Sequence, residues 1–184
     1  AGKSTTMGCI AGLLAADEGS IHVAGVDVPA DPVEARKHIG YVPQELDLYE
    51  YLTGQEFLQF VADIREMDPG ERDTEIDELL ELTELTDARH RVLKEYSGGM
   101  ARKIAICSAL IGHPELLLLD ESFVGLDPES TWRIRRRLDR YCKDGGAILL
   151  SSHILDMLER LCSRFVIIVD GKLDRDFGRE DFED

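Results

Sequence analysis

The sequence predicts an α/β protein in which helices flank a mainly parallel sheet. Short apolar runs stand at residues 116–119 (LLLL), 147–150 (AILL) and 165–169 (FVIIV), and helical stretches separate them. Strands buried on both faces read in this way, because the crossover helices of a parallel sheet cover both of its sides. The 184 residues, 43% of them hydrophobic, suffice for one sizeable core with a small subdomain attached.

The N-terminal part of the chain contributes a helix and a small antiparallel β part. Residues 3–14 read as a helix with Ile10, Leu13 and Leu14 on its apolar side. Residues 20–28 (SIHVAGVDV) alternate in polarity about a central Ala-Gly pair, which predicts a short hairpin.

A short helix and a strand follow the hairpin. Asp31 is a helix cap and Pro32 suits the first helical position, so a helix begins there. Residues 39–44 (IGYVPQ) read as a strand that stops at Pro43.

Residues 45–95 are acidic, rich in leucine and helical in period. Thr53 and Glu56 form a capping box before one helix, and an Asp-Pro pair at Asp68 starts the next. The apolar stripe of this second helix indicates packing between helices rather than a groove for a partner. It consists of Ile76, Leu79, Leu80 and Leu82. We therefore predict an α-helical subdomain at about 45–112, inserted between the two parts of the α/β core.

The chain carries 37 acidic and 21 basic residues, a formal net charge of −16. Such a surface repels phosphate backbones, which argues against nucleic acid or an anionic membrane as a non-specific partner. A high-salt cytoplasm and a biased nucleotide composition both stay open as origins of the acidity. No apolar run approaches the ~20 residues of a membrane span and no signal pattern is present, so we expect a protein that is soluble by itself.

The four cysteines stand singly in apolar or helical stretches, without the spacing of a zinc or redox site. We expect buried thiols in a reducing compartment. They are Cys9, Cys107, Cys142 and Cys162.

The first of three segments suited to phosphate chemistry is GKST at Gly2–Thr5. It matches the second half of the pattern G-x-x-x-x-G-K-[ST], in which backbone N–H groups and a helix start hold phosphates. Lys3 would reach the β- and γ-phosphates, and Ser4 would bind Mg²⁺. Four residues by themselves also fit an ordinary capped helix start in an unrelated protein.

The second segment, LLLLDE, ends a predicted buried strand with Asp120 and Glu121. Ligands of open α/β sheets bind at this carboxyl edge. Adjacent carboxylates there could divide the work, with Asp120 on Mg²⁺ through water and Glu121 orienting and deprotonating the attacking water. Two solvated strand-end acids are the alternative.

The third segment, YSGGM at residues 96–100, directly precedes an apolar helix. Ser97, Gly98 and Gly99 would leave free N–H groups at the start of that helix, which makes a second anion site in the same chain. An ordinary Ser-Gly-Gly cap explains the same residues.

Together these segments resemble the nucleotide-binding subunit of ATP-binding-cassette (ABC) transporters, over nearly the whole chain. Each motif is short and has its own false positives, but seven occur in the family's order. They are GKST, VPQ with Gln44, the helical stretch, YSGGM, LLLLDE, GLD with Asp127, and SSH with His153.

The resemblance implies a P-loop NTPase of ABC type that binds ATP and Mg²⁺. In that family the glutamine after the strand touches Mg²⁺ or the lytic water, a role that falls to Gln44, and the switch histidine contacts the γ-phosphate, a role that falls to His153. The implied catalytic residues are therefore Glu121, His153 and Gln44. The implied metal site consists of Ser4, Gln44 and Asp120, and Lys3 and Thr5 belong to the phosphate loop.

The family also places its signature serine and glycines against ATP held by the opposite subunit. The resemblance thus implies a head-to-tail homodimer or heterodimer, in which Ser97, Gly98 and Gly99 bind the nucleotide of the partner. Asp127 would line that interface. It can also cap the helix that begins at Pro128, and both roles are compatible.

Three segments resemble in sequence the ATPase subunits of two-component ABC exporters for drugs, ions or other small cargo. They are LYEYLTGQEFLQFVADI, YSGGMARK and LLLLDESFVGLDPES. This implies a separate membrane permease as partner, a place at the cytoplasmic face of the membrane, and no nucleic acid. Tyr96, Met100 and Ser122 depart from the family's commoner residues but leave the Ser-Gly-Gly core and the Asp-Glu pair intact.

Three other classes share parts of this pattern. A small-molecule kinase has the Lys-Ser-Thr loop, but not the second anion-binding helix start, the Asp-Glu pair or the histidine. Mechanical ABC proteins of chromosomes or translation differ in carrying a long coiled coil or two cassettes, and the acidic charge disfavours nucleic acid. A non-hydrolysing interaction domain has no need of Glu121.

The opening AGKSTT lacks the strand and leading glycine that normally precede such a loop. We therefore expect a cassette truncated within its phosphate loop, with neighbouring strands left unpaired and an apolar face exposed. The upstream aromatic that stacks on adenine in the family is absent too. The chain as given is then expected to bind Mg-ATP far more weakly than one extended upstream.

Overall fold

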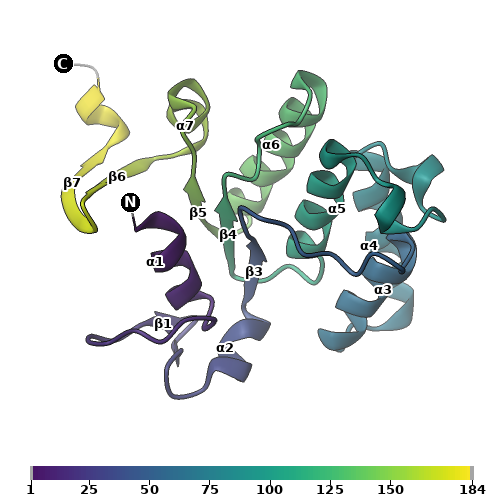
Figure 1. The fold of residues 1–184 in the computed structure, drawn as a ribbon, viewed down its shortest axis with the longest axis horizontal. Helices are drawn as coiled ribbons and strands as arrows, with labels where there is room; N and C mark the ends of the chain where they lie inside the picture. The colour runs from purple at the N-terminus through teal and green to yellow at the C-terminus, as the bar shows by residue number, and fades with distance from the viewer. Residues whose placement is uncertain (1, 183–184) are drawn as a thin grey trace.

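The computed structural model describes residues 2–182, apart from the side chains of residues 156, 157 and 182, and it has the predicted α/β fold (Figure 1). The helices are α1 (Lys3–Ile10), α2 (Pro32–Lys37), α3 (Gly54–Ile64), α4 (Pro69–Leu82), α5 (Gly98–Leu110), α6 (Pro128–Lys143) and α7 (Leu155–Leu161), with the short 3₁₀ turns η1 (Thr86–Ala88), η2 (Leu93–Glu95) and η3 (Arg179–Phe182). The strands are β1 (His22–Val23), β2 (Val26–Asp27), β3 (Ile39–Val42), β4 (Leu116–Asp120), β5 (Ala147–Ser151), β6 (Arg164–Val169) and β7 (Lys172–Gly178).

Strands β3, β4 and β5 form a parallel sheet with β4 in the centre. Val42 of β3 pairs with Leu119, and Ser151 of β5 pairs with Asp120, so all three strands end at one edge. The parallel pairing of the apolar runs at 116–119 and 147–150 is as predicted. Burial agrees for β4 but not for β5, in which Ala147 is exposed and Leu149 is 37% exposed.

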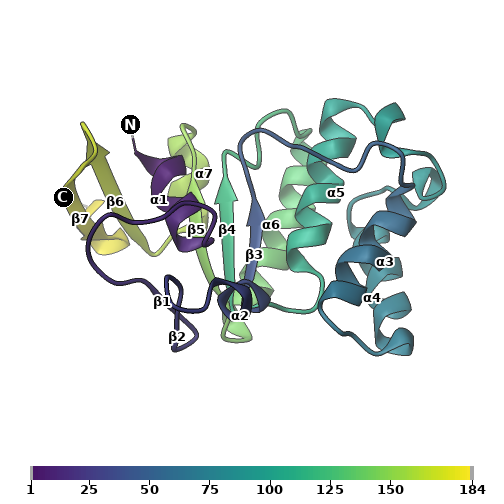
Figure 2. The ribbon, with the colours of Figure 1, turned by 60° about the horizontal axis from the view of Figure 1, so that its bottom comes forward.

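Helices cover both faces of this sheet (Figure 2). Leu117 and Leu119 belong to one buried cluster, which also holds residues of α5 and α6. Leu118, which points to the other face, packs in a second cluster with Ala11 after α1 and with Ala35 of α2. The alternation along β4 therefore buries both sides of the strand, as a continuous leucine run predicts.

The hairpin and the short helix after it are as predicted. Strands β1 and β2 pair antiparallel around the Ala-Gly turn, with Val23 opposite Val26. Asp31 caps α2 by accepting a hydrogen bond from the N–H of Glu34, and Pro32 occupies the first turn.

Helix α1 is shorter than the predicted span of residues 3–14. It ends at Ile10, and Gly12 then turns the chain with a φ of +65°. Leu13 and Leu14, expected on the apolar side of the helix, lie in the following loop and are 57% and 51% exposed. A left-handed glycine ends a helix readily, and this stop signal overrode the apolar pattern.

The apolar run 165–169 is a strand, but its assignment to the parallel sheet was wrong. Strand β6 pairs antiparallel with β7, which the sequence reading did not foresee, and the two form a separate sheet. Val166 and Val169 are 48% and 49% exposed, so β6 is not a fully buried strand. An apolar run predicts a strand without indicating its pairing partner.

Helices α3 and α4 lie to one side of the sheet, away from β6 and β7 (Figures 1 and 2). The capping box is present, because the side chain of Thr53 accepts from the N–H of Glu56 and the Glu56 carboxylate accepts from the N–H of Thr53. Three residues of the predicted stripe, Ile76, Leu79 and Leu80, are buried. Their cluster is shared with α5 and β4. The subdomain limits of about 45–112 stay a prediction.

All four cysteines are free thiols, but only Cys107 is buried. Burial raises the pKa of Cys107 to about 12, so this thiol stays neutral. Cys142 is exposed, which contradicts the expectation of buried thiols, because it lies on the outer side of α6 near its end. Among the described residues, no helix combines the length and the apolar character needed to cross a bilayer.

Candidate functional site

The carboxyl edge of the parallel sheet brings together the predicted residues from three strands. Because Val42 pairs with Leu119 and Asp120 with Ser151, the segments that follow β3, β4 and β5 leave the sheet side by side. Gln44, Glu121 and His153 stand in those segments. Residues that are remote in sequence are thus neighbours at one edge, where open α/β sheets bind ligands.

The start of α1 lies at the same edge and has the geometry of an anion site. Gly2 is the N-cap residue with a φ of +102°, which a residue with a Cβ adopts only with strain. No side chain caps the helix, so the N–H groups of the first turn, Lys3 to Thr5, are donors for a ligand. Helix α1 packs against β4, which fixes this start beside the strand that ends in Asp120.

Lys3, Glu121 and His153 converge on one point. The Lys3 Nζ lies 3.5 Å from Glu121 Oε1 and 3.4 Å from His153 Nε2. His153 Nε2 lies 3.2 Å from the same Glu121 oxygen. The Glu121 side chain is only 8% exposed, whereas that of His153 is 81% exposed. A largely buried carboxylate is therefore flanked by two basic groups, one of them open to solvent.

Glu121 is held in a strained backbone conformation. Its φ is +50°, in the left-handed region that costs a residue with a side chain roughly 1–2 kcal/mol. Its N–H donates to the carbonyl and to the hydroxyl oxygen of Ser151, at 3.1 and 3.2 Å. Ser151 therefore fixes the turn that aims Glu121 at Lys3, and strain of this kind is concentrated at functional sites.

Asp120 is buried, with 1% exposure, and its two oxygens differ. Oδ1 accepts a hydrogen bond from the Ser151 hydroxyl. Oδ2 is buried and has no hydrogen-bond partner among the described residues. A buried carboxylate oxygen left without a partner is costly unless a ligand or water completes it. The donor set of a carboxylate and the Ser4 hydroxyl therefore fits Mg²⁺, which prefers oxygen ligands and retains several waters.

Gln44 is exposed, and its backbone rather than its side chain is anchored. The guanidinium of Arg102, from α5, donates to the carbonyl oxygens of Pro43 and Gln44 at 3.0 and 2.9 Å. Burial lowers the pKa of Arg102, and the nearby Asp120 opposes that shift. The sequence reading missed Arg102 and Ser151. Arg102 stands three residues after Gly99 without a motif that marks its role, and the place of Ser151 beside Asp120 depends on strand register.

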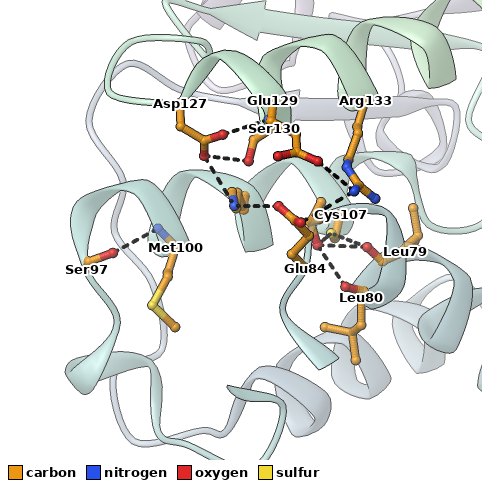
Figure 3. Close-up of polar contacts among 12 residues, drawn as sticks. Leu79, Leu80, Glu84, Ser97, Met100, Cys107, Asp127, Glu129, Ser130 and Arg133 are labelled. Atoms are coloured by element: carbon orange, nitrogen blue, oxygen red, sulfur yellow. Dashed lines mark hydrogen bonds and ion pairs between the residues drawn. The ribbon is translucent and has the colours of Figure 1, made fainter. Parts of the chain in front are cut away.

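Ser97, Gly98 and Gly99 form the start of α5, apart from the Lys3 cluster. The Ser97 hydroxyl accepts a hydrogen bond from the N–H of Met100 at 3.3 Å, so it caps the helix (Figure 3). None of the hydrogen bonds or ion pairs described for residues 2–182 joins this segment to Lys3 or Glu121. Strands β3 and β4 lie between α1 and α5 in both ribbon views, so the two helices are apart within one chain (Figures 1 and 2).

Asp127 caps α6, which is one of its two predicted roles. Its carboxylate accepts hydrogen bonds from the N–H and the hydroxyl of Ser130, at 2.8 and 2.6 Å (Figure 3). These bonds, helped by the Lys103 ammonium, lower the pKa of Asp127 to about 2. The side chain is 53% exposed, so it can also contact a partner.

A phosphate group at the start of α1 would meet the backbone donors, the Lys3 ammonium and the exposed His153 imidazole at once. Water beside it would meet the Glu121 carboxylate. With a parallel sheet ending at this point, the fold and the site define the class of P-loop nucleotide-binding proteins.

Comparison with known proteins narrows this class to one family. The model of the ABC transporter family matches residues 1–124. The chain is 38% identical to the linearmycin resistance ATP-binding protein of Bacillus subtilis over 173 residues, which are 94% of this chain and 56% of that protein. It is also 38% identical to the Nod factor export ATP-binding protein I of Rhizobium etli, over 94% of this chain and 54% of that one.

The chain therefore belongs to the ABC transporter family. It spans about half the length of these curated relatives. A solved structure of an ATP-binding subunit of an ABC transporter superposes with a TM-score of 0.93 at 32% identity, and the match covers 98% of this chain and 75% of that one. A dimeric ATP-binding cassette bound to ADP and phosphate has the same fold, with a TM-score of 0.87 over 96% of this chain and 80% of that one, at 23% identity.

Proposed function

We propose that this chain is the ATP-hydrolysing part of an ABC exporter whose membrane permease is a separate protein. The observation that carries the proposal is the meeting of Lys3, Glu121 and His153 within 3.5 Å of one another at the edge of the sheet. This meeting supports the roles implied by the motifs. The phosphate-binding Lys3, the base Glu121 and the γ-phosphate contact His153 must all lie around one reacting phosphate.

Glu121 acts as the general base in this proposal. Lys3 holds the β- and γ-phosphates, and the backbone donors of Gly2 to Thr5 complete the cradle. Nucleotide binding moves the Lys3 ammonium from the Glu121 carboxylate to phosphate oxygens, which frees that carboxylate to accept a proton from the attacking water. His153 contacts the γ-phosphate from its exposed position. The contact between His153 and Glu121 then depends on whether the γ-phosphate is present.

Asp120, Ser4 and Gln44 are the proposed residues of the magnesium site. The buried Asp120 Oδ2 supports this assignment, since an oxygen without a partner can hold a metal-bound water. Bound Mg²⁺ would supply charge neutralisation of the phosphates. The Arg102 hydrogen bonds keep the segment of Gln44 beside α5, so Gln44 can follow movements of the helices around it.

ATP sits between two subunits in the proposed assembly. The start of α5, with Ser97, Gly98 and Gly99, binds the nucleotide held by Lys3 of the opposite subunit, and Asp127 lines the interface. The separation of α5 from the Lys3 cluster within one chain supports this arrangement, because two phosphate-binding helix starts need not serve the same nucleotide. The second subunit is a copy of this chain or a related one.

The proposed permease, location and direction of transport are supported by the names of the relatives. Two of them are named for resistance to linearmycin and for export of Nod factor, which supports an exporter of small molecules, drugs or ions. Such a subunit would be held at the cytoplasmic face of the membrane by the permease. We also propose that the helical stretch at about 45–112 forms the inserted subdomain that contacts the permease.

The test is the substitution Glu121→Gln in the full-length protein, with Glu115→Gln as its matched control. Glu115 directly precedes β4 at the opposite edge of the sheet, so the same change of chemistry is made away from the site. Loss of a general base predicts a fall in ATP turnover of about 10²–10⁴-fold for Glu121→Gln, with ATP-driven dimerisation retained. Near-normal turnover of that variant would refute the assignment, and Glu115→Gln should hydrolyse ATP as the wild type does.

A further inference from the structure

Glu84 ends α4 in a backbone conformation that suits glycine. Its φ is +59°, and it follows Thr83, the C-cap residue after Leu82 at the end of the helix. The N–H groups of Glu84 and Leu85 donate to the carbonyls of Glu81 and Leu80, which is the Schellman pattern. A side chain at this left-handed position costs roughly 1–2 kcal/mol, which glycine avoids.

Glu66 provides a comparison within the same molecule. It ends α3 with a φ of +57° and the same two hydrogen bonds, donated by Glu66 and Met67. Its carboxylate is in no hydrogen bond or ion pair described for residues 2–182, although its charge helps to raise the pKa of Lys37. Two glutamates thus share one strained position, but only Glu84 forms ion pairs with two neighbouring helices.

The carboxylate of Glu84 joins two other helices. One oxygen lies 3.9 Å from the Lys103 Nζ on α5. The other lies 3.5 Å from a terminal guanidinium nitrogen of Arg133 on α6, and both of these residues, Glu84 and Arg133, are labelled in Figure 3. Glu84 therefore ties the end of α4 to the two helices that carry the signature serine and Asp127.

Lys103 carries this connection to the loop after Glu121. Its Nζ lies 3.5 Å from Asp127 Oδ2, and its side chain is 12% exposed. An ammonium withdrawn this far from water needs its carboxylate partners, since losing one leaves a costly, poorly compensated charge. Asp127 in turn caps α6, so Lys103 fixes the point at which the loop becomes a helix.

The start of α5 also touches this loop directly. A Cβ added at Gly99 would lie 3.2 Å from the carbonyl oxygen of Gly125, which is tighter than ordinary contact. The loop between Glu121 and Asp127 is therefore packed on one side against the segment Ser97–Gly99. A small shift of the loop would change the shape presented by that helix start.

We propose that Glu84 and Lys103 are positioning residues, which hold the 121–127 loop against the start of α5 in the arrangement that lets Ser97–Gly99 bind a phosphate. Neither residue touches nucleotide. The inference rests on the proposed function, in which that start serves the partner subunit's ATP.

The first experiment compares Glu84→Gly with Glu66→Gly in the full-length protein. Both substitutions remove a left-handed side chain, so the melting temperature of Glu66→Gly should equal the wild-type value or exceed it. That of Glu84→Gly should be lower than that of Glu66→Gly, because Lys103 and Arg133 also lose a carboxylate partner, and turnover is therefore compared below both melting temperatures. ATP turnover should fall about two- to thirtyfold for Glu84→Gly alone, the range seen for residues that couple sites. Turnover of Glu84→Gly equal to that of Glu66→Gly would overturn the proposal.

The second experiment asks in which site the defect appears. Two mixed dimers, isolated through different affinity tags, carry the same substitutions: Glu84→Gly and Lys3→Ala in separate chains, or both in one chain facing a wild-type chain. When the two substitutions are in separate chains, one ATP site is complete, and turnover should match that of a wild-type/Lys3→Ala dimer. When both substitutions are in one chain, the ATP site that keeps its Lys3 faces an α5 start without Glu84, and turnover should fall. Equal turnover of the two mixed dimers overturns the proposal, because a merely structural defect would not depend on this placement.

A measurement without ATP separates this inference from the proposed function. Amide hydrogen exchange of residues 122–126 should be faster in Glu84→Gly and in Lys103→Met than in the wild type, and unchanged in Glu66→Gly. Unchanged exchange in all three refutes the positioning role even if the protein hydrolyses ATP. Absence of ATP turnover in the wild type refutes the proposed function, and faster exchange would then still support the contact itself.

Discussion

The starts of α1 and α5 look alike in sequence, since both combine glycine with serine or threonine, but they differ in structure. Gly2 offers no cap, so the first turn of α1 has donors to spare beside Lys3 and Glu121. Ser97 caps α5 with its own hydroxyl, and the loop ending at Asp127 packs against this start. The start of α1 therefore keeps free backbone donors, whereas the start of α5 is held in shape by its cap and by the neighbouring loop.

The most direct test of separate roles disables one of the two helix starts in each of two subunits. Lys3→Ala should damage the site of its own chain and Gly99→Asp that of its partner, so each homodimer should lose about 10²–10³-fold in turnover. An equal mixture should recover up to about a quarter of wild-type turnover, because half of its dimers are mixed and each keeps one complete site. A mixture as inactive as its parents would contradict separate roles for the two starts.

Alanine at a glycine of each start should have opposite effects on stability. Gly2→Ala places a Cβ in a left-handed conformation, 3.4 Å from the Gly171 Cα, and should lower the free energy of unfolding by about 1–2 kcal/mol. Gly98→Ala meets nothing within 4 Å inside a helix, where alanine is favoured, and should leave stability unchanged or higher. Urea unfolding of both variants measures this. A loss of stability in Gly98→Ala as large as that in Gly2→Ala would remove the distinction.

The contribution of Asp127, the partner of Lys103 on α5, to the stability of the protein should change with pH only in acid. Hydrogen bonds from Ser130 and the charge of Lys103 lower the pKa of Asp127 to about 2 from its ordinary 3.8. A lowered folded-state pKa contributes stability above the unfolded value, and that contribution is lost as the pH falls from 3.8 towards 2. The difference in melting temperature between wild type and Asp127→Asn should thus be constant from pH 7 to about 5 and shrink below about 4. A difference that grows in acid would show that Asp127 is not held as an anion.

The sequence predicted most elements because local signals agreed with the tertiary structure. The capping box at Thr53 and the Asp-Pro start at Asp31 appear as expected, since each is decided by neighbouring residues. The parallel pairing of β4 and β5 was also predictable, because apolar runs separated by helical stretches are typical of parallel strands. The pairing of β6 was not, since it depends on β7, a polar strand without an apolar run.

The residues of the candidate site also fall into those that the sequence predicted and those that it did not. Motif order brought Lys3, Glu121 and His153 to attention, and the structure joins them. Their supports could not be read from spacing, because Ser151 acts on Glu121 through strand register and Arg102 acts on Gln44 across two elements. Glu84 was invisible for a further reason. A left-handed glutamate has no sequence signature, and its partners Lys103 and Arg133 lie on two other helices.

A small rotation of helix α6 near the site would cause a large displacement at the far end of the helix. Its 16 residues, at about 1.5 Å each, form a rod of about 24 Å with Asp127 at one end and Cys142 near the other. A tilt of about 10° at the Asp127 end would displace Cys142 by about 4 Å, because the displacement grows with distance along the helix. A dye attached to the exposed Cys142 would therefore convert a slight movement of the loop after Glu121 into a readable optical signal.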